Sequence, residues 1–343
     1  METLSDKIIT LAHGAGGAAM AELIDELFIH KLGNPVLDRR DDSAVLDIGS
    51  THIAFTTDSF VVDPLFFPGG DIGRLAICGT VNDLACAGAK PLVISSSFIL
   101  EEGLDMATLE AVVDSMRAAA DEAGVTVATG DTKVVPSGAA DRMFINTAGI
   151  GILRMRSDDP YLISGALAQP GDAVILSGTI ADHGMAVMSR REGFEFESEI
   201  VSDAAPLFGL VARVLDACSQ VHALRDPTRG GLASALNEIA RQSGVCIEVM
   251  ESSIPVSDAA RCACELLGID PLYVANEGKV VAIIAPDCAD TALQAMRSHP
   301  LGRNAARIGT VLAGPAGRVE LVSTYGNRRI LPLIHGEQLP RIC

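Results

Sequence analysis

Residues 52–89 read HIAFTTDSFVVDPLFFPGGDIGRLAICGTVNDLACAGA, and this stretch sets the expected fold. It opens with β-branched and aromatic residues, which are typical of a strand. A turn containing Pro and Gly follows, and residues 71–89 are then mostly small and apolar with helical spacing. A strand followed by such a helix predicts an α/β domain.

The flanking segments continue this alternation of strands and helices. In the N-terminal half we expect strands at 43–48, 52–60, 91–100, 125–130 and 142–153, and helices at 18–30, 71–89 and 105–124. In the second half we expect strands at 173–180, 246–250, 279–286 and 306–314, and helices near 183–191, 207–219, 231–243, 257–267 and 287–298. Residues 154–172 mix charges, Pro and Gly without periodicity, which places a domain boundary near residue 160.

Four parts are therefore expected. They are a Gly-rich loop and helix (1–40), an N-terminal α/β domain (41–158), a C-terminal α/β domain (159–313), and C-terminal strands with a mobile tail (314–343). The fold class is α/β or α+β.

Composition excludes several classes of function. The net charge of -18 argues against nucleic-acid binding, because phosphate backbones are bound by Lys and Arg surfaces. No apolar run approaches the roughly 18 residues of a membrane span, and the first residues lack a secretory signal. The eight cysteines lack small-scaffold spacing, so we expect reduced thiols in the cytoplasm.

Six acidic residues border or interrupt apolar segments, where an unpaired carboxylate is costly. They are Asp42, Asp58, Asp83, Asp131, Asp226 and Glu277. Any one of them alone is explained more simply as a helix cap or a local ion pair. A helix cap does not explain Asp83, because it lies inside a helix of small residues beside Asn82. Asp131 follows a strand with Lys133 two residues on, where open α/β sheets bind ligands. Together the six predict a site with several metal ions.

Two glycine-rich stretches precede predicted helices and are candidates for phosphate binding. The first contains His13, Gly14, Gly16 and Gly17, and the second contains Arg229 and Gly230. Backbone N–H groups at such positions can approach phosphate oxygens. A plain helix-start turn is the simpler explanation for either stretch alone, and His13 either touches phosphate or closes the turn.

Cys343, in the final PRIC, has no packing reason to be a cysteine. Cys78, Cys86, Cys246 and Cys288 are expected to be buried small residues, and the Cys262/Cys264 pair lies on a helix where its members point to different faces. For Cys343, the neighbouring Arg341 favours a thiolate and Ile342 can dock in an apolar slot. We interpret the tail as an arm that inserts into a site.

Several motifs together resemble the HypE family of hydrogenase expression/formation proteins: LAHGAGG, TDSFVVDPLFFPGGDIGRLAICGTVNDLACAGAKP, FILEEGL, TGDTKVV, FINTAGIG, ALRDPTRGG, ANEGK and the final PRIC. The resemblance covers essentially the whole chain. Some of these elements are shared more widely with aminoimidazole ribonucleotide synthetase (PurM-like), selenophosphate synthetase and thiamine-monophosphate kinase.

The resemblance implies an ATP-dependent carbamoyl dehydratase. A partner carbamoyltransferase of the HypF type would place a carbamoyl group on Cys343, and its dehydration would leave a thiocyanate. The cyanide would then pass to a HypC/HypD-type iron-carrying complex for a [NiFe] hydrogenase. The family fold implies that residues 41–158 bind ATP and form a homodimer.

Roles for individual residues follow from the same resemblance. Asp42, Asp58, Asp83, Asp131 and Asp226 would bind Mg²⁺, and Lys133 would stabilise the transferring phosphoryl group. The phosphate contacts would come from His13, Gly14, Gly16, Gly17, Asn82, Thr132, Arg229 and Gly230. Glu277 is the first choice of base, with Asp83 or neutral Lys133 as alternatives.

Two other functions remain open. The first is a kinase or synthetase of the same superfamily that acts on a diffusible small molecule, which would leave the PRIC ending unexplained. The second is a non-catalytic scaffold for maturation partners. Substitution of Cys343 separates the first alternative from the dehydratase, and substitution of Asp83 without loss of folding or partner binding tests the scaffold.

Overall fold

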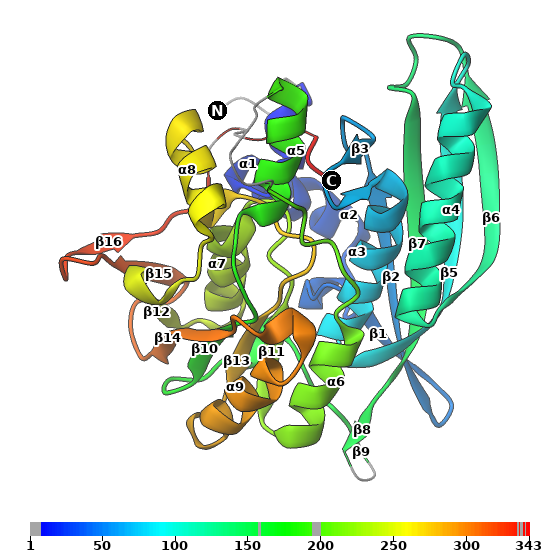
Figure 1. The fold of residues 1–343 in the computed structure, drawn as a ribbon. Coiled ribbons are helices and arrows are strands. Elements are labelled where there is room, and N and C mark those ends of the chain that lie inside the picture. The colour runs from blue at the N-terminus through cyan, green and yellow to red at the C-terminus, as the bar shows by residue number, and fades with distance from the viewer. Residues whose placement is uncertain (1–7, 157–158, 194–199, 335, 337–338, 340) are drawn as a thin grey trace.

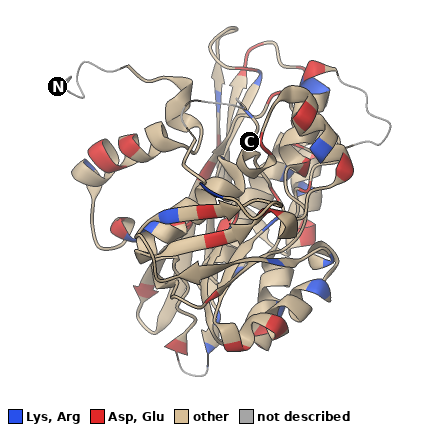
Figure 2. Cartoon of the chain, turned by 90° about the vertical axis from the view of Figure 1, so that its left-hand side faces the viewer, with Lys and Arg blue, Asp and Glu red and all other residues tan. Residues whose placement is uncertain are grey.

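The structure is a computed structural model, and it describes residues 8–156, 159–193, 200–334, 336, 339 and 341–343. The expected strand–helix alternation builds two sheets, which stand side by side in Figure 1. In the view of Figure 2, acidic and basic residues are interspersed over the helices and strands.

The N-terminal sheet has five strands. Their order is β1 (Ala44–Ile48), β2 (Thr51–Phe60), β7 (Met143–Leu153), β5 (Ala89–Glu101) and β6 (Thr126–Val135). All neighbours are antiparallel except the parallel pair β5 and β6. Strand β6 runs five residues past its predicted end, because its pairing with β5 continues to Glu101.

Two helices, α3 (Ile72–Cys86) and α4 (Met106–Ala123), cover one face of this sheet (Figure 1). The Asp71 carboxylate begins α3 by accepting hydrogen bonds from the backbone N–H groups of Gly73 and Arg74. Gly149 on β7 lets α3 approach closely, since a Cβ there would lie 2.6 Å from the Thr80 methyl group. The small residues of α3 therefore bring Asp83 close to the sheet.

In the described part of the chain, the opposite face of the sheet carries exposed apolar side chains. Phe55, Leu92, Ile99, Ile150 and Ile152 are all exposed. They lie on β2, β5 and β7, so the apolar surface runs across neighbouring strands.

The C-terminal sheet has seven strands. Their order is β11 (Val221–Arg225), β13 (Val281–Ile284), β10 (Ala173–Leu176), β14 (Ala306–Leu312), β12 (Cys246–Met250), β15 (Arg318–Val322) and β16 (Arg328–Ile330). Only β12 and β15 pair in parallel. Strand β11 was not predicted, because its five residues include His222 and show no clear alternation of apolar and polar residues.

Helices cover both faces of the second sheet. Helix α7 (Gly231–Ser243) packs on one face, and α6 (Phe208–Ala217) and α9 (Ala289–Arg297) pack on the other. Successive residues of β10 alternate between these two cores, as strand geometry requires. Helices α5 (Asp182–Glu192) and α8 (Asp258–Leu267) form a smaller third cluster.

The remaining elements are short. The predicted N-terminal helix is observed as α1 (Ala18–Leu23), a π-helical turn (Ile24–Ile29) and α2 (His30–Leu32). The strands β3 (Phe66–Phe67) and β4 (Gly70–Asp71) pair, as do β8 (Met155–Arg156) and β9 (Asp159–Pro160). Of the helices in the described ranges, none combines the length and the apolar character needed to cross a membrane.

Candidate functional site

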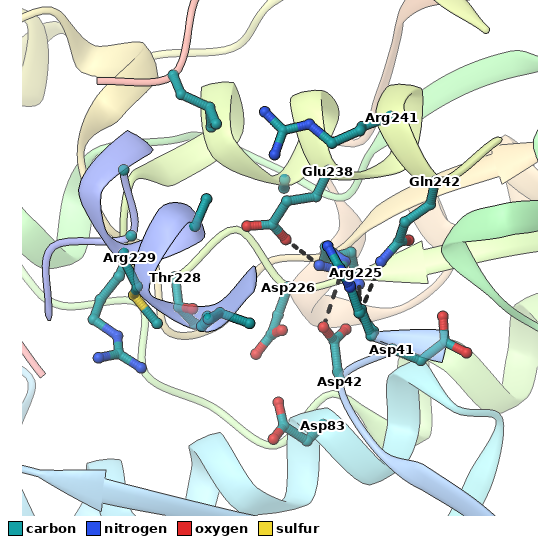
Figure 3. A pocket seen from close by; sticks show the side chains of 18 of the residues that line it. Asp41, Asp42, Asp83, Arg225, Asp226, Thr228, Arg229, Glu238, Arg241 and Gln242 are labelled. Carbon is teal, nitrogen blue, oxygen red and sulfur yellow. Dashed lines mark hydrogen bonds and ion pairs between the residues drawn. The ribbon is translucent and has the colours of Figure 1, made fainter. Parts of the chain in front are cut away.

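A cavity of about 500 Å³ opens between the two sheets. Its walls come from segments far apart in the sequence: the start of the chain, β2, α3 and the loop that joins β11 to α7. This volume lies in the range of ligand-binding pockets. Figure 3 shows Asp42, Asp83 and Asp226 pointing toward a common space within it.

Four of the predicted metal ligands meet in this cavity: Asp42, Asp58, Asp83 and Asp226. The Asp83 carboxylate accepts a hydrogen bond of 2.6 Å from the Thr56 hydroxyl. Arg225 forms an ion pair with Asp42, with 3.4 Å between Nε and the carboxylate oxygen, and a second ion pair with Glu238. Arg225 is buried and offsets only part of the negative charge of this cluster.

This excess shows in the pKa values of the four carboxyls. Burial, partly offset by Arg225, raises the pKa of Asp42 to about 6. Burial also raises the pKa of Asp58, and it raises the pKa values of Asp83 and Asp226 well above the ordinary range, with a further contribution from neighbouring carboxylates. Convergent carboxylates of this kind fit divalent cations, which remove the repulsion when they bind.

The structure does not bring Asp131, Thr132 or Lys133 to the cavity of the same protomer. All three are exposed on the edge strand β6, where Lys133 pairs with Asp131. The ladder places Asp131 opposite Ser97 on β5, while Asp58 lies two strands beyond β5 on β2. Three interstrand spacings amount to about 14 Å. Asp131 therefore cannot share a cation with Asp58 within one protomer.

In the first glycine stretch, Gly16 and Gly17 let other backbone segments pack closely against the chain. A Cβ on Gly16 would lie 2.4 Å from the Arg229 carbonyl oxygen, and a Cβ on Gly17 would lie 2.4 Å from that of Ile334. His13 closes its own turn, since its Nδ1 accepts a hydrogen bond of 3.0 Å from the Thr10 N–H. His13 does not line the cavity, so the structure favours the turn-closing alternative.

The second glycine stretch lies between the cavity and a smaller hollow beside it. Gly230 has a φ of +76° and precedes α7, and its neighbour Arg229 lines both spaces. The Arg229 guanidinium donates a hydrogen bond of 3.3 Å to the carbonyl oxygen of Gly14, which lines the smaller hollow. Arg229 is thus positioned to contact ligands in either space.

Cys343 lies in the smaller hollow, and this corrects the expectation of an exposed thiolate. Its backbone carbonyl accepts a hydrogen bond of 3.0 Å from Val61 N–H. Burial and the neighbouring Glu277 raise the pKa of Cys343 to about 12. Arg341, which was expected to favour the thiolate, instead pairs with Asp141. The arginine that does lower the pKa of the thiol is Arg229.

The segment before Cys343 is held by both domains. Ile342 is 4% exposed and packs in the core of the N-terminal domain, as the predicted apolar slot requires. His183 on α5 binds the Ile342 carbonyl oxygen through Nε2 at 2.9 Å. The tail was predicted to be mobile. Its described residues 341–343 are docked, while residues 335, 337, 338 and 340 lie outside the described part.

Glu277 is buried with an unsatisfied carboxyl oxygen, and its charge acts on Cys343. It is 3% exposed, and among the described residues its Oε1 has no hydrogen-bond partner. Burial and the charges of Asp226 and Asp203 raise its pKa well above the ordinary value. A buried carboxyl that the fold leaves unpaired is typical of a proton-transfer group.

Asn82 positions this region and does not face the cavity, which corrects the prediction of a phosphate contact. It is 1% exposed, and its amide donates hydrogen bonds of 3.1 Å to the carbonyl oxygens of Ala205 and Glu277. Its Oδ1 accepts a third hydrogen bond from Leu207 N–H. Asn82 therefore joins α3 to the C-terminal domain and fixes the backbone at Glu277.

Sequence reasoning missed three residues of the site: Thr56, Arg225 and Cys86. Thr56 and Arg225 hold two of the carboxylates, as described above. Cys86, expected to be a packing residue, has its sulfur close to the carboxylates of Asp42 and Asp226. The TTD and LRDPTRGG motifs contain the first two, so proximity to Asp58 and Asp226 could have indicated them.

Known proteins resemble the chain over nearly its whole length. Residues 40–153 match the family described as AIR synthase related protein, N-terminal domain, and residues 169–322 match the corresponding C-terminal domain family. The carbamoyl dehydratase HypE of Azotobacter vinelandii is 52% identical over 336 residues, which is 98% of this chain and 97% of the relative.

Two solved structures are similar in both sequence and fold. A crystal structure of a HypE–HypF complex matches with a TM-score of 0.85 and 47% identity, covering 91% of this chain and 99% of the other. A crystal structure of the hydrogenase maturation protein HypE in complex with ATP matches with a TM-score of 0.82 and 48% identity. That match covers 98% of this chain and 100% of the other.

Proposed function

Because the chain belongs to the HypE family of carbamoyl dehydratases, we propose that it dehydrates a carbamoyl group on the Cys343 sulfur to a thiocyanate, using ATP. The observation that carries this proposal is the position of Cys343. The thiol lies in a hollow that Arg229 shares with the acidic cavity, and the charge of Glu277 acts on the thiol.

The larger cavity suits a nucleotide. Met20, Ile24 and Leu37 provide an apolar wall for a base, and the carboxylates lie on the side of α3 and β2. A related HypE has been crystallised with ATP, and we infer that this chain binds ATP in the same cavity.

Magnesium ions are the cations we propose for the carboxylates. Asp42, Asp58, Asp83 and Asp226 would hold them, and the bound ions would neutralise phosphate oxygens. Arg229 and the glycine stretches would add further charge and N–H donors for the phosphates.

We propose that the carbamoyl oxygen leaves as part of phosphate. The carbamoyl oxygen forms a bond to the γ-phosphorus of ATP as ADP leaves, and phosphate then departs with that oxygen as the carbon–oxygen bond breaks. Both protons of the carbamoyl nitrogen are lost, and the S–C≡N group remains. The net reaction converts the S-carboxamide and ATP into thiocyanate, ADP, phosphate and a proton.

Glu277 is the base we propose for the carbamoyl nitrogen. Its raised pKa makes the ionised carboxylate a stronger base than an exposed glutamate. Asn82 fixes its backbone, and its Oε1 has no hydrogen-bond partner in the described chain that would compete for the proton. Asp83, an alternative base, accepts a hydrogen bond from Thr56 and belongs to the carboxylate cluster.

We propose a homodimer formed through the open apolar face of the N-terminal sheet. Phe55, Ile99 and Ile150 are exposed on that face, and such a patch favours an interface. A dimer offers the one route by which the Lys133 of a second protomer could act at the cavity, because Lys133 lies outside the cavity of its own protomer.

This arrangement can be tested by mixing two inactive variants, Lys133→Ala and Cys343→Ser. If Lys133 acts across the interface, mixed dimers contain one complete site and regain part of the activity. Size-exclusion chromatography of each variant alone should show a dimer. Absence of recovery in verified mixed dimers would restrict Lys133 to its own protomer.

The proposed partners follow from the relatives. A HypE has been crystallised with HypF, and we propose that a HypF-type carbamoyltransferase loads Cys343. A HypC/HypD-type complex would accept the cyanide, in the cytoplasm.

The test is the mass of the peptide that contains Cys343. After carbamoylation by the transferase, Mg-ATP should remove one water from this peptide in the wild type. Glu277→Gln should keep ATP binding and the carbamoyl group but not lose water. Persistent carbamoyl with continued ATP hydrolysis in the wild type would indicate a diffusible substrate. No ATP hydrolysis under any condition would favour the scaffold.

A further inference from the structure

The thiol of Cys86 lies against two carboxylates of the acidic cavity. We propose that Asp42, Cys86 and Asp226 form a mixed carboxylate–thiolate site for a thiophilic divalent cation such as Zn²⁺ or Cd²⁺. This site shares two carboxylates with the proposed magnesium site, and neither its argument nor its test depends on turnover.

The geometry suits a single ion. One oxygen of each carboxylate and the Cys86 sulfur all lie within 4.8 Å of one another. Around a tetrahedral zinc ion, with Zn–S near 2.3 Å and Zn–O near 2.1 Å, ligand atoms are about 3.5 Å apart. Side-chain movements of about 1 Å would therefore complete the set, leaving a fourth position for water or a substrate oxygen.

Asp226 is an independent indication that this cluster binds a cation. It is 9% exposed, and Figure 3 shows its carboxylate directed into the cavity. Across the described residues the Asp226 carboxylate forms no ion pair and accepts no hydrogen bond from another residue. Arg225, next in sequence, pairs with Asp42 and Glu238 instead. A buried carboxylate in this state is expected to bind a cation.

Cys86 makes the site different from one built of carboxylates alone. It is the last residue of α3 and is 3% exposed. Oxygen ligands suit Mg²⁺, whereas a sulfur ligand favours softer cations. On binding, the thiol releases its proton to solvent, so that Cys–SH and M²⁺ give Cys–S–M⁺ and H⁺.

Cys78 provides a matched control on the same helix. It lies eight residues before Cys86 and is also fully buried, but it does not belong to this cluster. Thiols that reach the surface would also bind a soft metal. The experiment therefore starts from the full chain in which Cys262, Cys288 and Cys343 are replaced by Ser.

The probe is Cd²⁺ alone, titrated in the presence of excess Mg²⁺. We expect an ultraviolet cadmium–thiolate charge-transfer band that saturates at one ion per chain. Cys86→Ala should abolish the band and Cys78→Ala should retain it. Asp226→Asn, which leaves the thiol intact, should weaken binding by at least the roughly tenfold that loss of an outer-shell partner costs.

Two results would overturn the proposal. One is an undiminished band in Cys86→Ala with native circular dichroism. The other, decisive even if Cys86→Ala does not fold, is Cd²⁺ affinity unchanged in Asp226→Asn. Because the readout is metal binding, the proposed dehydration can fail without affecting this result, and the reverse also holds.

Discussion

Neutralising Asp42 is predicted to stabilise the metal-free protein at neutral pH. The folded protein raises the pKa of Asp42 from 3.8 to about 6, mainly through burial, and its side chain is only 14% exposed. A shift of about 2 units corresponds to about 3 kcal/mol. The ionised carboxylate therefore destabilises the fold by about this amount, net of its attraction to Arg225.

The pH dependence has a definite sign. The folded state holds the Asp42 proton more tightly than the unfolded chain, so this contribution to stability is present below about pH 4. It is lost as the pH rises to about 6. Relative to wild type, Asp42→Asn should gain up to about 3 kcal/mol between pH 4 and pH 7.

Urea unfolding followed by circular dichroism in EDTA measures this difference at each pH. Asp114→Asn is the matched control, because Asp114 is an exposed carboxylate on α4. Adding Mg²⁺ should stabilise the wild type more than Asp42→Asn. The reasoning would be refuted if Asp42→Asn were no more stable, relative to wild type, at pH 7 than near pH 4.

Three further outcomes are expected. Asp203→Asn should shift the acidic side of the profile of dehydration rate against pH to lower pH, because the Asp203 charge raises the pKa of Glu277. An unshifted profile would exclude Glu277 as the titrating base. Ile342→Ala removes about 2 kcal/mol of apolar burial that holds the tail in its docked position. Alkylation of Cys343 by iodoacetamide should therefore accelerate by up to about 30-fold. An unchanged rate would contradict docking of the tail. Arg229→Gln should slow the same alkylation, because Arg229 lowers the pKa of the thiol; faster alkylation would oppose this.

The sequence predicted the carboxylate cluster well because its members border elements of recognisable type. Asp58 lies on a strand, Asp83 interrupts an apolar helix, and Asp226 precedes a glycine turn, so their convergence followed from the α/β pattern. Asp131 looked equivalent by the same criteria. Its strand proved to be a sheet edge, and strand order depends on long-range pairing that local pattern does not reveal.

The environment of individual groups was harder to predict. Cys343 was expected to be an exposed thiolate, whereas the docking of Ile342 and its hydrogen bond to His183 leave Cys343 half-buried with a raised pKa. Asn82 was assigned to phosphate from the family resemblance, but its amide instead bonds carbonyl oxygens of the C-terminal domain, because adjacent helical residues point in different directions. Cys86 was predicted to be a buried small residue of an apolar helix, and its burial is confirmed. Its proximity to Asp42 and Asp226 was not predictable, because it depends on where α3 meets the β11–α7 loop.

The most direct test of the proposed function follows one oxygen atom. Cys343 would be carbamoylated with ¹⁸O in the carbonyl position, and the protein would then receive unlabelled Mg-ATP for a single turnover. We expect the peptide with Cys343 to lose the label as thiocyanate forms, and the released phosphate to carry one ¹⁸O per turnover. Thiocyanate formation with unlabelled phosphate would contradict phosphorylation of the carbamoyl oxygen, and label retained on the peptide despite ATP hydrolysis would contradict dehydration itself.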